Sequence, residues 1–331
     1  MTAKSRSETG RNRILRRVRR QRLKYITVLP SLITLLNGIC GLGAICFASK
    51  GAEMGNIGHY LNKPQLTCFA MAGYMIGLAM LFDVLDGRVA RMSQSTSSFG
   101  GQLDSLCDMI SFGVAPAFLM LKLLELEIMP IRDANPAFGI FLNRFVWLAA
   151  AAYMSCGAIR LARYNVENKE DETAHMSFWG LPIPAAAGVV GSLVVFYQDM
   201  LPALAEKNTW PYHLGENIII CSLPFIMVGI AALMVSRIRY PHLLNQYLRG
   251  RKPFGHLIRI GLFLVLIILN FEAAMVLISC GFALSGFLRW FYYRVLSRKR
   301  LHESAGEAPV LTITNPLDEP TNDSETGLAD K

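Results

Sequence analysis

Four aspartates lie in two pairs within DVLDGRVARMSQSTSSFGGQLDSLCD, the stretch that covers residues 83–108. Asp83 and Asp86 are three positions apart, and Asp104 and Asp108 are four apart, so each pair occupies one face of a helix. Carboxylate oxygens are hard ligands that suit Mg²⁺ or Mn²⁺. We therefore interpret the stretch as two helix ends whose acidic faces meet in one pocket and hold one divalent cation or two.

Carboxylates that converge in a poorly hydrated pocket repel one another, and a bound cation relieves that repulsion. The alternative is a set of aspartates solvated at helix ends, where they cap the helices or pair with Arg88 and Arg91. That alternative would account for one acidic pair. Two facing pairs favour a metal site.

The residues between the two pairs predict a site for a diphosphate. Gly87, Ala90, Gly100 and Gly101 are small and let a bulky ligand approach the backbone. Arg91 can hold a phosphate through two parallel hydrogen bonds. The start of the following helix adds backbone N–H groups and the positive end of a helix dipole.

The elements that carry these residues are membrane spans. The chain of 331 residues is 53% hydrophobic and only 17% charged, whereas soluble domains carry about a quarter charged residues. Long apolar runs predict an all-α, polytopic membrane bundle of about eight helices. The expected spans are 28–48, 66–91, 101–127, 141–163, 181–199, 216–236, 257–270 and 273–295. The last two have a single plausible break, Asn270–Glu272, so six or seven spans stay possible.

Charge predicts three regions and an orientation. A basic arm is expected over residues 1–27, a membrane-embedded domain with the predicted metal site over 28–296, and a disordered acidic tail over 297–331. With both termini in the cytoplasm, 27 Lys and Arg fall inside and six outside, as the positive-inside rule requires. The arm suits either an interfacial helix on anionic lipid or a flank that orients the first span. Nucleic-acid binding is not expected, because the arm offers no aromatic stacking surface.

The aspartate stretch resembles the signature of the CDP-alcohol phosphatidyltransferases. Its spacing, D-x2-D-G-x2-A-R-x8-G-x3-D-x3-D, is filled at all eight fixed positions. The resemblance implies a dinuclear metal site made by all four aspartates, with Asp108 also the general base on the acceptor hydroxyl. It further implies a homodimer and a CDP site lined by Gly87, Ala90, Arg91 and Gly100. The resemblance also implies that six of the expected helices form a core, with a C-terminal pair added.

Five further segments are similar to the bacterial integral-membrane phosphatidylserine synthases. They are LPSLITLLNGICGLGAI (29–45), SFGVAPA (111–117), RLARYNV (160–166), FWGLPIPAAA (178–187) and MVSRIRYP (234–241). This resemblance implies transfer of a phosphatidyl group from CDP-diacylglycerol to L-serine, with release of CMP. It implies a protein of the bacterial cytoplasmic (inner) membrane, surrounded by membrane lipid. The orientation predicted from charge then puts the active site at the cytosolic face, where the lipid head group lies.

Several residues have two interpretations. Thr34 and Asn37 either help to bind the nucleotide, as the resemblance suggests, or make interhelical hydrogen bonds. Arg160 and Arg163 either bind a donor phosphate or the serine carboxylate, or serve as a positive flank, and Arg160 should lie deeper. Ser111 is a further candidate for the acceptor pocket.

Glycines in the first span, at 38, 41 and 43, are expected to permit close helix packing rather than to form a nucleotide loop.

Three alternative functions have to be weighed. The same reaction could use another alcohol, such as glycerol 3-phosphate, inositol phosphate or choline, although a phosphorylated acceptor would need more cations than the sequence offers. A divalent-cation transporter would need acidic or polar residues through the middle of the bilayer, where the predicted spans are apolar. A lipid-binding scaffold would not need a base at Asp108.

Overall fold

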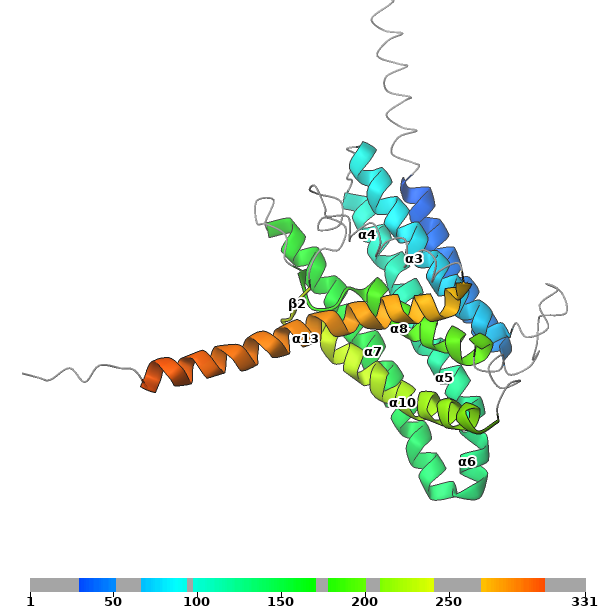
Figure 1. The fold of residues 1–331 in the computed structure, drawn as a ribbon. Coiled ribbons are helices and arrows are strands. Elements are labelled where there is room, and N and C mark those ends of the chain that lie inside the picture. The colour runs from blue at the N-terminus through cyan, green and yellow to red at the C-terminus, as the bar shows by residue number, and fades with distance from the viewer. Residues whose placement is uncertain are drawn as a thin grey trace, which may run out of the picture. The chain divides into compact units, whose positions relative to one another are not determined.

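The computed structural model describes residues 30–51, 67–93, 98–170, 178–200, 209–240 and 269–306. These residues form helices, as the sequence predicts, together with one pair of two-residue strands, β1 (Phe178–Trp179) and β2 (Arg239–Tyr240). The helices are Pro30–Gly51, α3 (Cys68–Ser93), α4 (Ser98–Asp108), α5 (Ala115–Glu127), α6 (Met129–Ala134), α7 (Pro136–Glu170), α8 (Ile183–Val195), α10 (Thr209–Val235) and α13 (Phe271–Gly306), with π-helical segments η1 (Met109–Val114) and η2 (Phe196–Met200) (Figure 1).

Five described helices are long and apolar enough to cross a membrane: Pro30–Gly51, Cys68–Val89, Phe99–Glu127, Pro136–Val166 and Phe271–Arg294. Two shorter apolar helices, Ile183–Asp199 and Ile219–Val235, coincide with the predicted fifth and sixth spans. The predicted polytopic helical bundle is therefore confirmed. The expected span 257–270 lies almost wholly outside the described residues, and the count of eight stays a prediction.

Two helices extend clearly beyond the predicted spans. The helix α7 runs from Pro136 to Glu170 against a predicted 141–163, and α10 begins at Thr209 rather than at 216. Hydropathy marks the apolar middle of a helix, whereas backbone hydrogen bonds continue through the polar turns at its ends. Asn270 is not helical and α13 begins at Phe271, within the predicted break Asn270–Glu272, while a separate span before it stays a prediction.

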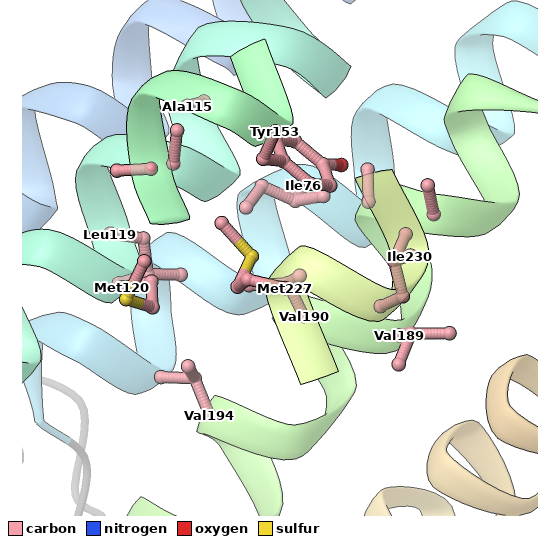
Figure 2. Close-up of a cluster of buried hydrophobic side chains, with 14 of the residues drawn as sticks. Ile76, Ala115, Leu119, Met120, Tyr153, Val189, Val190, Val194, Met227 and Ile230 are labelled. Carbon is pink, nitrogen blue, oxygen red and sulfur yellow. The ribbon is translucent and has the colours of Figure 1, made fainter. Parts of the chain in front are cut away.

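The core lies where α3, α5, α7, α8 and α10 pack together. Figure 2 shows side chains from each of these helices in one cluster, among them Ile76, Leu119, Tyr153, Val190 and Met227, all fully buried. Burying such side chains against neighbouring helices gives dense van der Waals contact. The resulting packing is a fixed frame for the polar residues near the ends of α3 and α7.

Close helix approach depends on small residues. A Cβ added to Gly73 of α3 would lie 2.9 Å from the Gly191 carbonyl oxygen of α8. In the helix Pro30–Gly51, a Cβ on Gly38 would lie 3.0 Å from the Cys107 Sγ, and one on Gly41 would lie 2.6 Å from the Ser111 Cα. The prediction that first-span glycines permit close packing is confirmed for Gly38 and Gly41.

The contacts within the chain divide it into two compact units, Met1–Leu288 and Arg289–Lys331. In the first unit, the Tyr74 hydroxyl of α3 donates to Asp199 at 2.7 Å and lies 3.2 Å from Glu272 in the first turn of α13. In the second unit, the Arg294 guanidinium lies 5.0 Å from the Trp290 ring centroid.

Candidate active site

The four aspartates lie on α3 and α4. Asp83 and Asp86 are in the last three turns of α3, while Asp104 and Asp108 are in the second half of α4, which ends at Asp108. The helix α4 begins at Ser98 rather than at the predicted Gly101, so both of its aspartates lie further from the helix N-terminus than expected.

Three of the four carboxylates converge. One oxygen each from Asp83, Asp104 and Asp108 lies within 4.8 Å of the others. Asp108 is only 8% exposed, and the other two are half-buried. Negative charges this close repel strongly where water is scarce, and a ligated divalent cation offsets the repulsion. The donor set consists of hard oxygens alone, so these residues fit Mg²⁺ or Mn²⁺.

The fourth carboxylate, Asp86, has a different environment. It is buried and accepts a hydrogen bond from the Thr34 hydroxyl at its Oδ2 atom. Thr34 also lies within hydrogen-bond distance of the Pro30 carbonyl oxygen, at 3.0 Å. The convergence expected of four carboxylates is therefore seen for three, and a metal-binding role of Asp86 stays a prediction.

Asn37 holds the carboxylate of Asp108. The Asn37 Nδ2 atom donates to Asp108 Oδ1 at 2.8 Å, and the Asn37 side chain is completely buried. Its Oδ1 atom has no hydrogen-bond partner among the described residues. Thr34 and Asn37 thus both make the interhelical hydrogen bonds that the sequence offered as one interpretation, and each bond ends on a signature aspartate.

A cavity of about 610 Å³ adjoins the three converging carboxylates. Its walls come from α3, α4, α7 and the start of α8, and it is lined by Asp83, Gly101, Gln102, Asp104, Ser105, Asp108, Arg160, Leu161, Tyr164, Asn165, Pro182, Ile183 and Pro184. Acidic, cationic and apolar surfaces therefore meet in one space. Such a lining suits a ligand with a charged head and an apolar body.

The two arginines of α7 differ in their placement. Arg160 is 6% exposed, lines the cavity, and donates from Nε to the Leu181 carbonyl at 3.3 Å. Arg163 is half-buried and donates from Nη1 to the Val235 carbonyl of α10 at 3.4 Å, and it is not among the residues that line the cavity. The expectation that Arg160 lies deeper is met.

The small residues of the signature leave space beside the carboxylates. A Cβ on Gly87 or Gly101 would have no heavy atom within 4 Å, and Gly101 lines the cavity. Gly100 precedes it on α4 and is half-buried. Ala90 and Arg91 belong to α3, but their side chains lie outside the described part of the chain.

This site geometry agrees with the result of comparison with known families. A family model described as CDP-alcohol phosphatidyltransferase matches residues 27–285, which include both aspartate pairs and every wall of the cavity. The chain belongs to the CDP-alcohol phosphatidyltransferase family. Enzymes of this family generally depend on a divalent metal, in agreement with the carboxylate cluster.

Named relatives in the family are similar over most of the chain. A CDP-diacylglycerol–serine O-phosphatidyltransferase of Helicobacter pylori is 31% identical over 268 residues, which cover 81% of this chain and 93% of the relative. One of Methanocaldococcus jannaschii is 32% identical over 68% of this chain and 79% of its own. An archaetidylserine synthase of Methanothermobacter thermautotrophicus is 31% identical over 67% of this chain and 72% of its own.

The sequence did not predict one polar link in this phosphatidyltransferase site. The Asn165 Nδ2 atom of α7 donates to the Ser105 hydroxyl of α4 at 2.9 Å, and that hydroxyl lies 3.0 Å from the Gly101 carbonyl. Both side chains line the cavity. Their only signal in the sequence was a polar residue near the end of each apolar run, and many membrane helices show that feature.

Two of the segments that resemble phosphatidylserine synthases, 178–187 and 234–241, lie side by side, and the first of them lines the cavity. β1 pairs with β2, which brings Trp179 opposite Arg239. Gly180 then turns the chain with φ +82°, and a Cβ there would lie 3.0 Å from the Ser236 carbonyl oxygen. Only glycine suits this position, and the turn places Pro182 and Pro184 in the cavity wall.

Proposed function

We propose that this protein is a CDP-diacylglycerol–serine O-phosphatidyltransferase, which transfers the phosphatidyl group of CDP-diacylglycerol to L-serine and yields phosphatidylserine and CMP. The observation that carries the proposal is the convergence of Asp83, Asp104 and Asp108 beside a cavity. Relatives that bear this enzyme name cover most of the chain and support serine as the acceptor. The family and these names favour the enzyme over the divalent-cation transporter.

In this proposal the aspartates hold two divalent cations, either Mg²⁺ or Mn²⁺. Asp83, Asp104 and Asp108 supply the converging oxygens, and Asp86 supplies a fourth carboxylate whose Oδ2 atom accepts from Thr34. When bound, the cations neutralise the diphosphate and the negative charge that develops on departing CMP. The chain's own contribution is to fix these oxygens before substrate arrives, through burial and through the contacts of Thr34 and Asn37.

Asp108 is the general base of the proposed reaction. Its Oδ1 atom accepts from Asn37, so the serine proton is assigned to the other carboxylate oxygen. As that proton moves to Asp108, the serine oxygen forms a bond to the β-phosphorus of CDP-diacylglycerol. The phosphorus–oxygen bond to CMP breaks on the opposite side, and CMP leaves with the electron pair.

The donor site is proposed to include Gly87, Ala90, Arg91 and Gly100. The open space beside Gly87 supports close approach of the CDP group. Thr34 and Asn37 are proposed to contribute next to it, because their hydrogen bonds already place them against Asp86 and Asp108.

The acceptor site is proposed to lie in the cavity near Arg160, which binds the serine carboxylate. Ser111 is completely buried and donates to the Asn37 carbonyl at 2.8 Å, and it is not among the cavity-lining residues. An acceptor contact from Ser111 or Arg163 therefore has less support than one from Arg160.

The proposed membrane is the bacterial cytoplasmic membrane, with the basic arm 1–27 and the acidic tail 297–331 in the cytoplasm and domain 28–296 embedded. The excess of Lys and Arg on one side supports this orientation and an active site at the cytosolic face. A homodimer is proposed from the family resemblance alone. Protease accessibility in inside-out vesicles tests the orientation, and cross-linking in native membrane tests the dimer.

Purified protein given CDP-diacylglycerol is expected to release CMP when L-serine is added. The measurement is CMP release, and lipid product, with serine, glycerol 3-phosphate, inositol phosphate and choline supplied one at a time. Release that requires serine supports the proposal. Release only with a different alcohol would show that serine is not the acceptor, while the assignment as a phosphatidyltransferase would stand. No release with any alcohol would refute the enzyme assignment.

Arg160→Lys is expected to raise the KM for serine about tenfold or more, with a smaller effect on kcat. Lysine keeps the charge but loses the planar pair of donors that a carboxylate matches. Arg163→Lys is the matched comparison, since Arg163 contacts Val235 rather than the cavity. A larger rise in the serine KM for Arg163→Lys would transfer the acceptor role to Arg163.

A further inference from the structure

The helix that carries Asp108 changes its hydrogen-bond register directly after this residue. α4 ends at Asp108, η1 covers Met109–Val114, and the Ala115 N–H donates to the Ile110 carbonyl five residues earlier. Each such turn holds one residue more than an α-helical turn. One inserted residue rotates the helix before it by about 100° relative to the helix after it.

Because of this rotation, the direction of the α4 side chains relative to those of α5 differs from that in a continuous α-helix. After η1, α5 buries Leu119, Met120 and Leu123 in the core. Before η1, Asp104 and Asp108 line the cavity. The π-helical turn therefore determines where the carboxylates point once α5 is packed.

A proline and a tyrosine account for this register. Pro116 has no N–H, so it cannot donate to the Phe112 carbonyl four residues earlier, and its ring pushes that carbonyl aside. The Tyr153 hydroxyl of α7 donates to the same carbonyl at 2.9 Å. Tyr153 is completely buried, so its hydroxyl replaces the missing backbone donor where water cannot.

Hydrogen bonds also connect Ser111 of η1 to Asp108 through Asn37. The Ser111 hydroxyl donates to the Asn37 carbonyl at 2.8 Å, at the point where Gly41 lets the two helices touch. The Asn37 side chain in turn donates to Asp108 at 2.8 Å. A chain of contacts thus runs from Tyr153 through Phe112 and Ser111 to Asn37 and the carboxylate.

We propose that Tyr153 is a positioning residue for phosphatidyl transfer: its hydroxyl holds the π-helical turn that keeps Asp108 against Asn37. This inference rests on the proposed function, because the group that is positioned is the proposed base. Tyr153 does not touch the cavity, so it acts on kcat through Asp108 rather than on substrate binding.

The test compares Tyr153→Phe with Tyr240→Phe. Tyr240 is a matched control, since it is also buried and its hydroxyl donates to a backbone carbonyl, that of Ala283, at 3.2 Å. Both variants should lower the thermal unfolding midpoint. Only Tyr153→Phe should lower kcat, by about tenfold or more, with the KM values for serine and CDP-diacylglycerol within about twofold of wild type.

Equal kcat values per folded molecule for the two variants would overturn the proposal. If Tyr153→Phe does not fold, the variant Pro116→Ala tests the proposal instead. Its new backbone N–H can donate to the Phe112 carbonyl in place of the Tyr153 hydroxyl, which favours the α-helical register. That variant should stay folded and lose about tenfold or more in kcat, and a kcat within about twofold of wild type would overturn the proposal. Wild-type protein that releases no CMP with serine would instead refute the proposed function, before any variant is compared.

Discussion

Asp108→Asn is expected to abolish serine-dependent CMP release while the protein stays folded. Loss of a general base alone costs about 10²–10⁴ in rate, and this substitution also removes one of the three converging carboxylates. The fold should survive because the asparagine oxygen can still accept from Asn37, which contacts Asp108 at 2.8 Å. The measurements are kcat for CMP release and the thermal unfolding midpoint.

The repulsion among the carboxylates allows a second test of this prediction, the thermal unfolding midpoint in the presence of chelator. Asp108 is only 8% exposed and lies among other negative charges, so a neutral side chain removes repulsion. With chelator present, Asp108→Asn should therefore unfold at or above the wild-type midpoint. Asp199→Asn is the matched control, since Asp199 is half-buried, accepts from Tyr74 at 2.7 Å and lies outside the site. Full activity in Asp108→Asn, or an equal loss in Asp199→Asn, would remove Asp108 as the base.

The sequence predicted those parts of the site that follow from local spacing. Intervals of three and four residues place each aspartate pair on one helix face, and a short connection between two apolar runs brings the faces together. Asp83, Asp104 and Asp108 converge accordingly. The break at Asn270 was also predictable, because polar residues interrupt an apolar run there.

The sequence did not predict which residues of distant segments contact each other. Hydrogen bonds from Thr34 to Asp86 and from Asn37 to Asp108 join residues 52 and 71 positions apart. Spacing within a helix does not show which neighbouring helix meets a given face. The sequence alone therefore predicts that Asp86 joins the other carboxylates and does not predict its bond to Thr34.

The π-helical turn after Asp108 had one local sign, Pro116 in the middle of an apolar run. A proline predicts an interrupted hydrogen-bond ladder but does not specify how the ladder is repaired. The repair requires Tyr153, 41 positions from Phe112.

Removal of divalent metal is expected to abolish activity and to lower the stability of the wild-type protein. Chelator should stop CMP release, and added Mg²⁺ or Mn²⁺ should restore it, because the converging carboxylates supply hard oxygen donors. Binding to the folded state alone stabilises it by about 2.7 kcal/mol at a metal concentration 100 times the Kd. The thermal unfolding midpoint of the wild type should therefore rise with metal concentration in the absence of substrate.

The number of ions can be tested through Asp86. The Thr34 hydroxyl bonds the Oδ2 atom of Asp86, so a second ion would have to use the other oxygen or displace that hydroxyl. Metal analysis of the purified protein should give two ions per chain for wild type and fewer for Asp86→Asn. The double variant Asp83→Asn with Asp104→Asn, which leaves one carboxylate of the converging three, should lose the metal-dependent rise in midpoint. One ion in both wild type and Asp86→Asn would confine the site to the three converging carboxylates, and an unchanged rise in the double variant would place the metal elsewhere.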